Sequence, residues 1–163
     1  MNDRPCEAIA NPIHVYKSAL LREAVPVLSL MDREPFSPTR GCMDRTYWAW
    51  KFTDFPGARF QEGLCFLSFL YATSLEANPY YQQPKLLEWI ATGFDWWSKI
   101  QYSQGEFDEA YPFERSLAAT AFTSFYLAEA WNLLDGKLPP DLANRFRRTL
   151  MRADDWLLKN DEG

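Results

Sequence analysis

The sequence is poor in the residues that build disulfide frameworks, metal sites and phosphate loops. Among its 163 residues are three cysteines (Cys6, Cys42 and Cys65) and one histidine, His14. An odd number of widely spaced cysteines beside a single histidine fits neither a disulfide framework nor a zinc site. The seven glycines are scattered, and a Gly-x-Ser-x-Gly nucleophile motif is absent. We therefore expect no metal and no cofactor.

The chain also lacks an excess of positive charge and a long hydrophobic run. Its formal net charge is −5, which does not favour binding to nucleic acid. No apolar run approaches the roughly 20 residues that cross a bilayer, so we expect no membrane partner. Residues 1–5 have none of the basic and apolar character of a secretory signal, and a cytoplasmic location is the default expectation.

Helical periodicity is abundant. Apolar side chains recur every three or four residues through five stretches, while no stretch alternates apolar and polar residues as a strand would. The sequence predicts an all-α chain with a loose N-terminal arm at 1–14 and a helical-hairpin domain at 15–163. The predicted helices span residues 15–31, 58–75, 84–101, 113–134 and 139–159.

Proline and glycine mark the boundaries of these helices. Pro26 should kink or split the first helix, because proline lacks an N–H group and its ring clashes with the preceding turn. A stretch rich in charged and aromatic residues, 44–56, can form a short helix that ends before Pro56-Gly57. A second charged loop occupies 101–112.

The four later helices form an imperfect repeat of two hairpins. Phe60 matches Phe113 at an offset of 53 residues, whereas Trp96 matches Trp156 at an offset of 60. A loop insertion in the second hairpin explains the larger offset. Repeated hairpins cannot bury their apolar faces alone and must stack on neighbours.

The predicted helices are of two kinds. Those at 58–75 and 113–134 are rich in aromatic or small side chains and are expected to be inner helices. Those at 84–101 and 139–159 carry more charge and are expected to lie outside them. Inner helices enclosed by outer ones make an α/α-toroid. Two hairpins would be an incomplete toroid, which is either part of a longer one or associates with copies of itself.

Two motifs precede the inner helices. The first runs Asp44-Arg45-x-Tyr47-Trp48-x-Trp50-Lys51-x-x-Asp54-Phe55-Pro56. The second runs Gly105-Glu106-Phe107-Asp108-Glu109-x-Tyr111-Pro112-x-Glu114-Arg115-Ser116. Together they resemble heparinase II/III-like proteins over residues 15–160. The resemblance implies the N-terminal part of an α/α-toroid in a family that includes polysaccharide lyases. The catalytic Tyr, His and Asn that those lyases place further along have no match here.

Both motifs are expected to open on the same side of the stack. Cations near helix N-termini suit a uronate carboxylate or a sulfate, and aromatic rings can stack on sugars. The structural alternative is that the rings belong to the core and that Asp44 caps a helix. In that case Arg45 pairs with Asp54, or Arg59 with Glu62, and Asp108 and Glu109 are solvated loop charges. The substrate-binding candidates are Asp44, Arg45, Trp48, Lys51, Asp54, Arg59, Glu114 and Arg115.

Two reactions would suit these residues. β-Elimination from a uronic acid needs a cation to neutralise the carboxylate and a base, for which a tyrosine beside an arginine can serve, with His14 as the alternative. Glycoside hydrolysis needs two carboxyl groups about 5–10 Å apart, and the sequence leaves their pairing open. The catalytic candidates are Tyr47, Asp108, Glu109 and Tyr111.

The sequence thus predicts a domain that handles an acidic or surface polysaccharide, as part of a lyase or a glycoside hydrolase. The alternative is a non-catalytic helical-repeat module that binds a glycan or a protein partner. Self-association is expected in either case, because the end hairpins of an incomplete stack keep one apolar side without a partner.

Overall fold

The computed structural model describes residues 12–160. Within them the chain is all-α, as predicted, and its only β-type pairing is one bridge between Phe107 and Ser116. None of the helices in this range is long and apolar enough to cross a membrane. The elements are α1 (Pro12–Arg22), α2 (Ala24–Leu30), α3 (Arg45–Trp48), the 3-10 helix η1 (Ala58–Glu62), α4 (Gly63–Ala72), α5 (Pro84–Ile100), α6 (Leu117–Leu134) and α7 (Pro140–Asn160).

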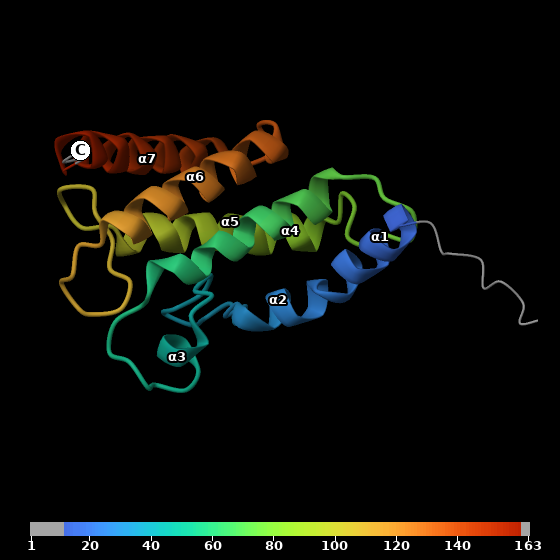
Figure 1. Cartoon of the computed structure of the whole chain (residues 1–163), viewed down its shortest axis with the longest axis horizontal. Helices are drawn as coiled ribbons and strands as arrows, with labels where there is room; N and C mark the ends of the chain where they lie inside the picture. Colours follow the sequence, from blue (N-terminus) through green and yellow to red (C-terminus); the bar gives the residue numbers. More distant parts are fainter. Residues whose placement is uncertain (1–11, 161–163) are drawn as a thin grey trace, which may run out of the picture.

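Helices α4 to α7 form two hairpins that pack in two layers (Figure 1). The hairpin α4–α5 lies beside the hairpin α6–α7, so that α4 contacts α6 in one layer and α5 contacts α7 in the other. This arrangement pairs the helices that the sequence grouped together, and we call α4 and α6 the inner helices and α5 and α7 the outer helices.

The outer helices are amphipathic and bury one face each. On α5 the buried side chains include Ile90, Phe94 and Trp97, which recur every three or four residues. Phe94 meets the edge of Phe146 from α7, with ring centroids 4.7 Å apart. Trp97 stacks on Phe107 at 4.6 Å. These aromatic pairs join α5 to α7 and to the loop that precedes α6.

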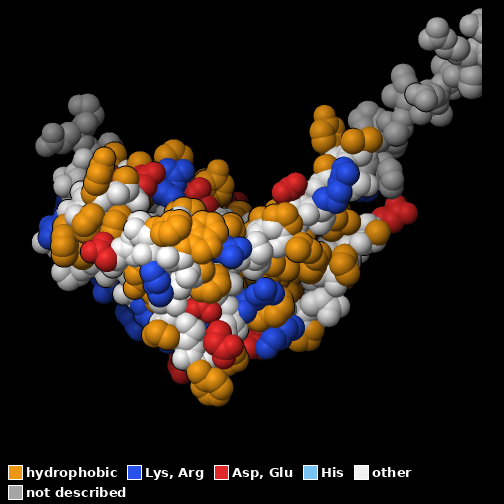
Figure 2. Space-filling model, turned by 90° about the horizontal axis from the view of Figure 1, so that it is seen from below, with side chains coloured by type: hydrophobic (Ala, Val, Ile, Leu, Met, Phe, Trp, Pro, Cys, Tyr) orange, Lys and Arg blue, Asp and Glu red, His pale blue; other side chains and the backbone are white. Residues whose placement is uncertain are grey.

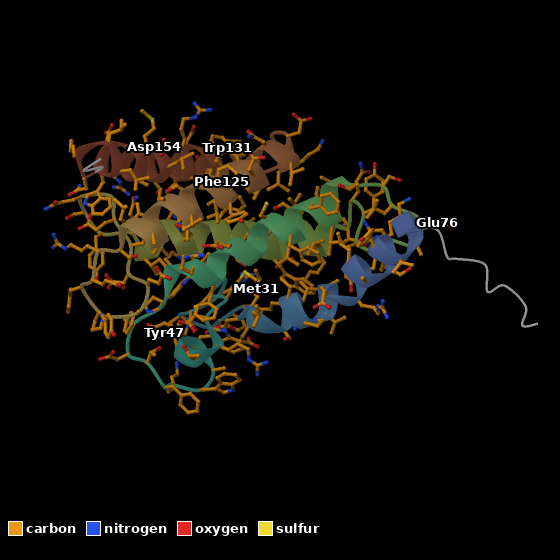
Figure 3. The ribbon with its side chains drawn as sticks, in the orientation of Figure 1. Met31, Tyr47, Glu76, Phe125, Trp131 and Asp154 are labelled. Atoms are coloured by element: carbon orange, nitrogen blue, oxygen red, sulfur yellow. The ribbon has the colours of Figure 1, made fainter. Side chains whose placement is uncertain are left out.

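The inner helices carry few charges on any side. Helix α6 buries small side chains, among them Thr120, Thr123 and Ser124, where it packs on its neighbours. Its other face exposes Phe122 and Phe125, the latter labelled in Figure 3. A helix that is apolar all round is normally buried on every side. The solvent-facing side of α6 therefore has the composition of a covered surface.

Pro26 splits the first predicted helix. Helix α1 ends at Arg22 and α2 begins at Ala24. In an unbroken helix the ring of Pro26 would clash with the carbonyl group of Arg22, four residues earlier. Helix α1 projects from the two layers, and the outline in Figure 2 is notched beside it. Because α1 begins at Pro12, it includes the end of the arm predicted at 1–14; the rest of that arm lies outside the described residues.

The inner helices are shorter than predicted, whereas the outer ones match within one residue. The stretch predicted as one helix over 58–75 is η1 followed by α4, which ends at Ala72. The helix predicted over 113–134 begins only at Leu117. Phe113 has a φ of +63°, which no α-helix accommodates, so the prediction was wrong at this end.

Candidate functional site

The two predicted motifs lie in loops that meet at one end of the hairpins, beside the starts of η1 and α6 (Figure 1). We call residues 41–57 the first loop and residues 101–116 the second loop. Gly57 donates its N–H to a carboxylate oxygen of Asp44 over 2.9 Å. The next residue donates its N–H to the carbonyl oxygen of Asp108 over 3.0 Å. Adjacent peptide groups thus bind both loops, which lie on one side as expected.

Each loop contains a glycine that lies against an outer helix. Gly41 has a φ of +93° and Gly105 a φ of +121°, which residues with a Cβ rarely adopt. A Cβ on Gly41 would overlap the carbonyl oxygen of Thr92 on α5, and one on Gly105 would overlap that of Arg152 on α7. Thr92 and Arg152 are 60 residues apart. This spacing equals the offset predicted for the outer helices.

A four-residue pattern common to both loops was not recognised in the sequence. In each copy the third residue is buried and donates its N–H to a side chain of the inner layer: Met43 to Gln61, and Phe107 to Thr120. Gln61 and Thr120 are 59 residues apart, so these two hydrogen bonds relate the units by 59 residues, whereas the sequence comparison of the inner helices predicts 53. The two copies are Gly41-Cys42-Met43-Asp44 and Gly105-Glu106-Phe107-Asp108.

The carboxylate of Asp44 is buried and holds the first loop together. One oxygen accepts the N–H groups of Thr46 and Tyr47 at the start of α3 and the hydroxyl of Thr46 over 2.5 Å. The other accepts the N–H of Gly57. Asp44 is thus an N-cap, the structural alternative raised from the sequence.

Asp108 has the corresponding role in the second loop. It accepts the phenol O–H of Tyr102 over 2.6 Å and the N–H groups of Phe113 and Arg115 over 2.8 and 3.0 Å. Burial, followed by this bond to the carboxylate, raises the pKa of Tyr102. Asp108 therefore fixes the left-handed backbone that leads into α6.

Arg59 connects the inner layer to the second loop. Its guanidinium pairs with Glu62 and, over 3.3 Å, with Glu109. Glu109 also accepts the hydroxyl of Ser116, the residue that caps α6, over 3.1 Å. The hydrogen bond from Arg59 to Glu62 is the chief reason why the pKa of Arg59 is raised. Arg59 and Glu109 therefore join η1 to the start of α6.

Glu114 closes a tight turn at the tip of the second loop. One of its oxygens accepts the N–H groups of residues 109–111 over 3.2, 2.7 and 3.3 Å. These bonds, that from Ala110 foremost, lower the pKa of Glu114. Tyr111 lies at this tip with 69% of its surface exposed.

An ion pair with one buried partner lies within the second loop. Glu106 is only 1% exposed, and the Nε of Arg115 lies 3.3 Å from one of its carboxylate oxygens. Neither carboxylate oxygen has a conventional hydrogen-bond donor among the described residues. Glu106 was not among the predicted site residues. The sequence alone does not show that Glu106 is buried, because its pairing with Arg115 becomes visible only in the fold.

Aromatic rings and cations lie together on the first loop. The guanidinium of Arg45 lies 5.1 Å from the ring centre of Trp50, which packs on Phe52 at 5.8 Å. The ammonium of Lys51 lies 5.7 Å from the ring centre of Tyr47. Trp50 and Phe52 are exposed, Phe52 by 79%. This surface combines flat apolar rings with positive charge.

The remaining candidates of the first motif differ in their surroundings. Trp48 donates its indole N–H to the carbonyl oxygen of Leu30 over 2.7 Å and so ties α3 to α2. Tyr47, labelled in Figure 3, lies 6.2 Å from the ring of Trp96 on α5. Asp54 is exposed. Trp48 is therefore a structural contact.

Neither a metal site nor a reactive thiol is found among the described residues. No group of three or more His, Cys, Asp or Glu side chains in residues 12–160 could hold a metal ion. Burial raises the pKa of Cys42 to about 12, which leaves its thiol neutral at physiological pH.

No protein-family model, no curated protein and no solved structure matches the chain. The resemblance to heparinase II/III-like proteins therefore rests on the two motifs alone.

Proposed function

We propose that the chain binds an acidic polysaccharide or oligosaccharide at the loop edge, the surface that the first and second loops form together. The observation that carries the proposal is the juxtaposition of aromatic rings and cations there, among which Trp50, Phe52 and Lys51 are exposed. Arg45 lies over Trp50 and Lys51 over Tyr47 in the first loop. Sugar rings present apolar C–H faces that can lie on aromatic rings, while carboxylate or sulfate groups favour arginine and lysine.

Binding without catalysis accounts for more of the geometry than a lyase or hydrolase does. A catalytic carboxyl group must exchange a proton with the substrate. The carboxylate of Asp108 is buried and accepts three hydrogen bonds within its own loop. Glu109 binds Arg59 and the capping hydroxyl of α6. Tyr47 and Tyr111 are left as rings that can contact a sugar.

The wider proposal is that the two hairpins belong to an α/α-toroid of the heparinase II/III-like type. Its support is the contact of inner helix with inner helix and of outer helix with outer helix. Further support comes from the glycine and aspartate that recur before each inner helix. In such a toroid the loop edges of successive hairpins would form one continuous binding surface.

Titration calorimetry with a heparin-derived oligosaccharide tests the binding proposal, with a neutral dextran fragment as the control ligand. We expect heparin to bind and Trp50→Ala or Arg45→Ala to weaken binding about tenfold, or about 1.4 kcal/mol. Arg148→Ala, at an exposed position of α7, is the matched control and should bind like the unaltered chain. Equal binding by all three variants would exclude the loop edge as the site.

The same samples test the catalytic alternative. A lyase would produce unsaturated uronates, which absorb ultraviolet light, and a hydrolase would produce new reducing ends. We expect neither product. Steady product formation that Tyr111→Phe or Glu109→Gln abolishes would replace the binding proposal with an enzymatic one.

We also propose that the exposed face of α6 mediates self-association. The apolar side chains of Leu117, Phe122 and Phe125 are exposed on this helix, which carries few charges. We expect sedimentation velocity to show dimers or larger species whose population rises with concentration. Phe125→Ser should shift the population towards monomer. A monomer at millimolar concentration would refute this part of the proposal.

A further inference from the structure

An open groove of about 880 Å³ runs along α5, between the segment 35–40 and the start of α7. Its apolar lining includes Leu87 and Ala91 from α5 and Leu142 from α7. Ligand-binding clefts commonly have volumes of about 300–1,000 Å³. The groove lies on the outer layer and shares no residue with the loop edge.

Two groups of ion pairs flank this apolar strip. At one, Glu88 on α5 pairs with Arg40 over 2.7 Å and with Lys85 over 2.8 Å. At the other, Asp95 pairs with Lys99 over 2.5 Å and with Arg145 from α7 over 2.6 Å. Glu88 and Asp95 are seven residues apart, which is two helical turns or about 10 Å. Among the cations that line the groove, Glu88 thus holds Arg40, and Asp95 holds Lys99 and Arg145.

Positive charge exceeds negative charge in this groove although the whole chain is acidic. Four cations, Arg40, Lys99, Lys137 and Arg145, line it with two acids, Glu88 and Asp95. A guanidinium has five N–H donors, so an arginine that already pairs with one carboxylate can bind a second. Because Arg40 and Arg145 pair with acids about 10 Å apart along α5, the groove suits a ligand with two separate anionic groups and an apolar body between them.

The chemistry of the lining distinguishes among such ligands. Among the described residues that line the groove, none is aromatic. Sugars and nucleic-acid bases are held largely by stacking on aromatic rings, which this groove does not offer. An amphipathic helix needs none: it presents apolar side chains at intervals of three and four residues and can carry acids seven residues apart on the same face.

We propose that this groove docks an acidic amphipathic helix of a partner protein. Two carboxylates seven residues apart on that helix would pair with Arg40 and Arg145, and apolar side chains between them would cover Leu87 and Leu142. The ion pairs already present hold the cations in place, which lowers the entropy cost of binding.

The probe is a labelled helical peptide of 16 residues with two glutamates seven positions apart and leucines at the third and fourth positions between them. One control peptide has the glutamates five positions apart, which places them on different faces of the helix. A second has lysine in place of both glutamates. Fluorescence anisotropy with the full chain measures binding. Chemical-shift changes of backbone amides in α5 and α7 locate it.

We expect the matched peptide to bind at least about fivefold more tightly than either control peptide. Arg145→Gln and Arg40→Gln should each weaken it about fivefold, while Arg148→Gln on α7 should leave it unchanged. Equal binding of the three peptides, no binding of the matched peptide, or shift changes outside the groove would overturn the proposal. Displacement of the peptide by a heparin-derived oligosaccharide, with the same losses in both variants, would assign the groove to a glycan instead.

Discussion

The residue that follows the loop glycine is Cys42 in the first hairpin unit and Glu106 in the second. Both side chains are buried, at 0% and 1% exposure. A neutral thiol tolerates that position, and burial raises the pKa of Cys42 to about 12. A carboxylate does not tolerate it without a partner, and Glu106 has Arg115 at 3.3 Å.

The two units therefore share a backbone arrangement but stabilise it differently. In both, a left-handed glycine contacts an outer helix and a buried aspartate binds the backbone that enters an inner element. The second unit adds an ion pair that spans its loop, and Arg115 itself has a φ of +53°. The repeat thus preserves backbone geometry more closely than side-chain chemistry.

Substitution of the loop glycines should have the largest effect. We expect Gly41→Ala and Gly105→Ala each to lower the free energy of unfolding by about 3 kcal/mol, because the new Cβ would combine an unfavourable φ with an overlap on an outer helix. Urea unfolding measures the change. Gly136→Ala is the control, since its φ is +73° but no atom lies within 4 Å of the new Cβ, and it should cost about 1 kcal/mol. A loss at one loop glycine only would show that the units do not share this contact.

Removal of the Arg115 side chain should have the second-largest effect on stability, and it concerns the second unit alone. We expect Arg115→Ala to destabilise the chain by about 2 kcal/mol, because it leaves the buried carboxylate of Glu106 without a cation. The double variant with Glu106→Gln should recover more than half of the loss. No recovery in this cycle, measured by urea unfolding, would mean that Arg115 acts through its backbone rather than through the ion pair.

Substitution of the loop aspartates, Asp44 and Asp108, should destabilise the chain less, and by similar amounts in the two units. Asp44→Asn and Asp108→Asn should each cost about 1 kcal/mol, because an amide cannot replace both acceptor oxygens. Asp54→Asn, at an exposed position of the first loop, should be neutral. Melting temperatures at one pH suffice for this comparison. A neutral result at Asp108 would contradict its role in holding the backbone before α6.

The smallest effect concerns pH and the second loop alone. Backbone hydrogen bonds, that from Ala110 foremost, lower the pKa of Glu114 in the folded chain. Its contribution to stability should therefore be present above its unfolded pKa of about 4.3 and disappear as pH falls through the lower folded value. Glu114→Gln should accordingly lower the melting temperature slightly at pH 7 and not at pH 2. An equal shift at both pH values would exclude the carboxylate as the cause.

Periodicity predicted the outer helices well because each buries one face. Pro84 and Pro140 fix their first turns, and the observed bounds differ from the predicted ones by one residue. Pro26 likewise marked the break between α1 and α2. Apolar content alone did not locate the start of α6, because Phe113 is exposed in a left-handed loop.

The candidate site was predicted less completely than the helices. The two motifs do lie together, and Arg45 and Lys51 do contact aromatic rings. Sequence reasoning could not distinguish a carboxylate that caps a helix, such as Asp44, from one available to a ligand. It also missed Glu106 and the groove along α5, since both depend on contacts between residues far apart in the chain.

The most direct test of the proposed function is nuclear magnetic resonance of the chain during addition of a heparin-derived tetrasaccharide. We predict that the indole signal of Trp50 and the amide signals of the first and second loops move together with one saturation curve. The indole signal of Trp131, on α6 and labelled in Figure 3, should stay in place. Movement of the Trp131 signal without the Trp50 signal, or no movement at all, would contradict the account.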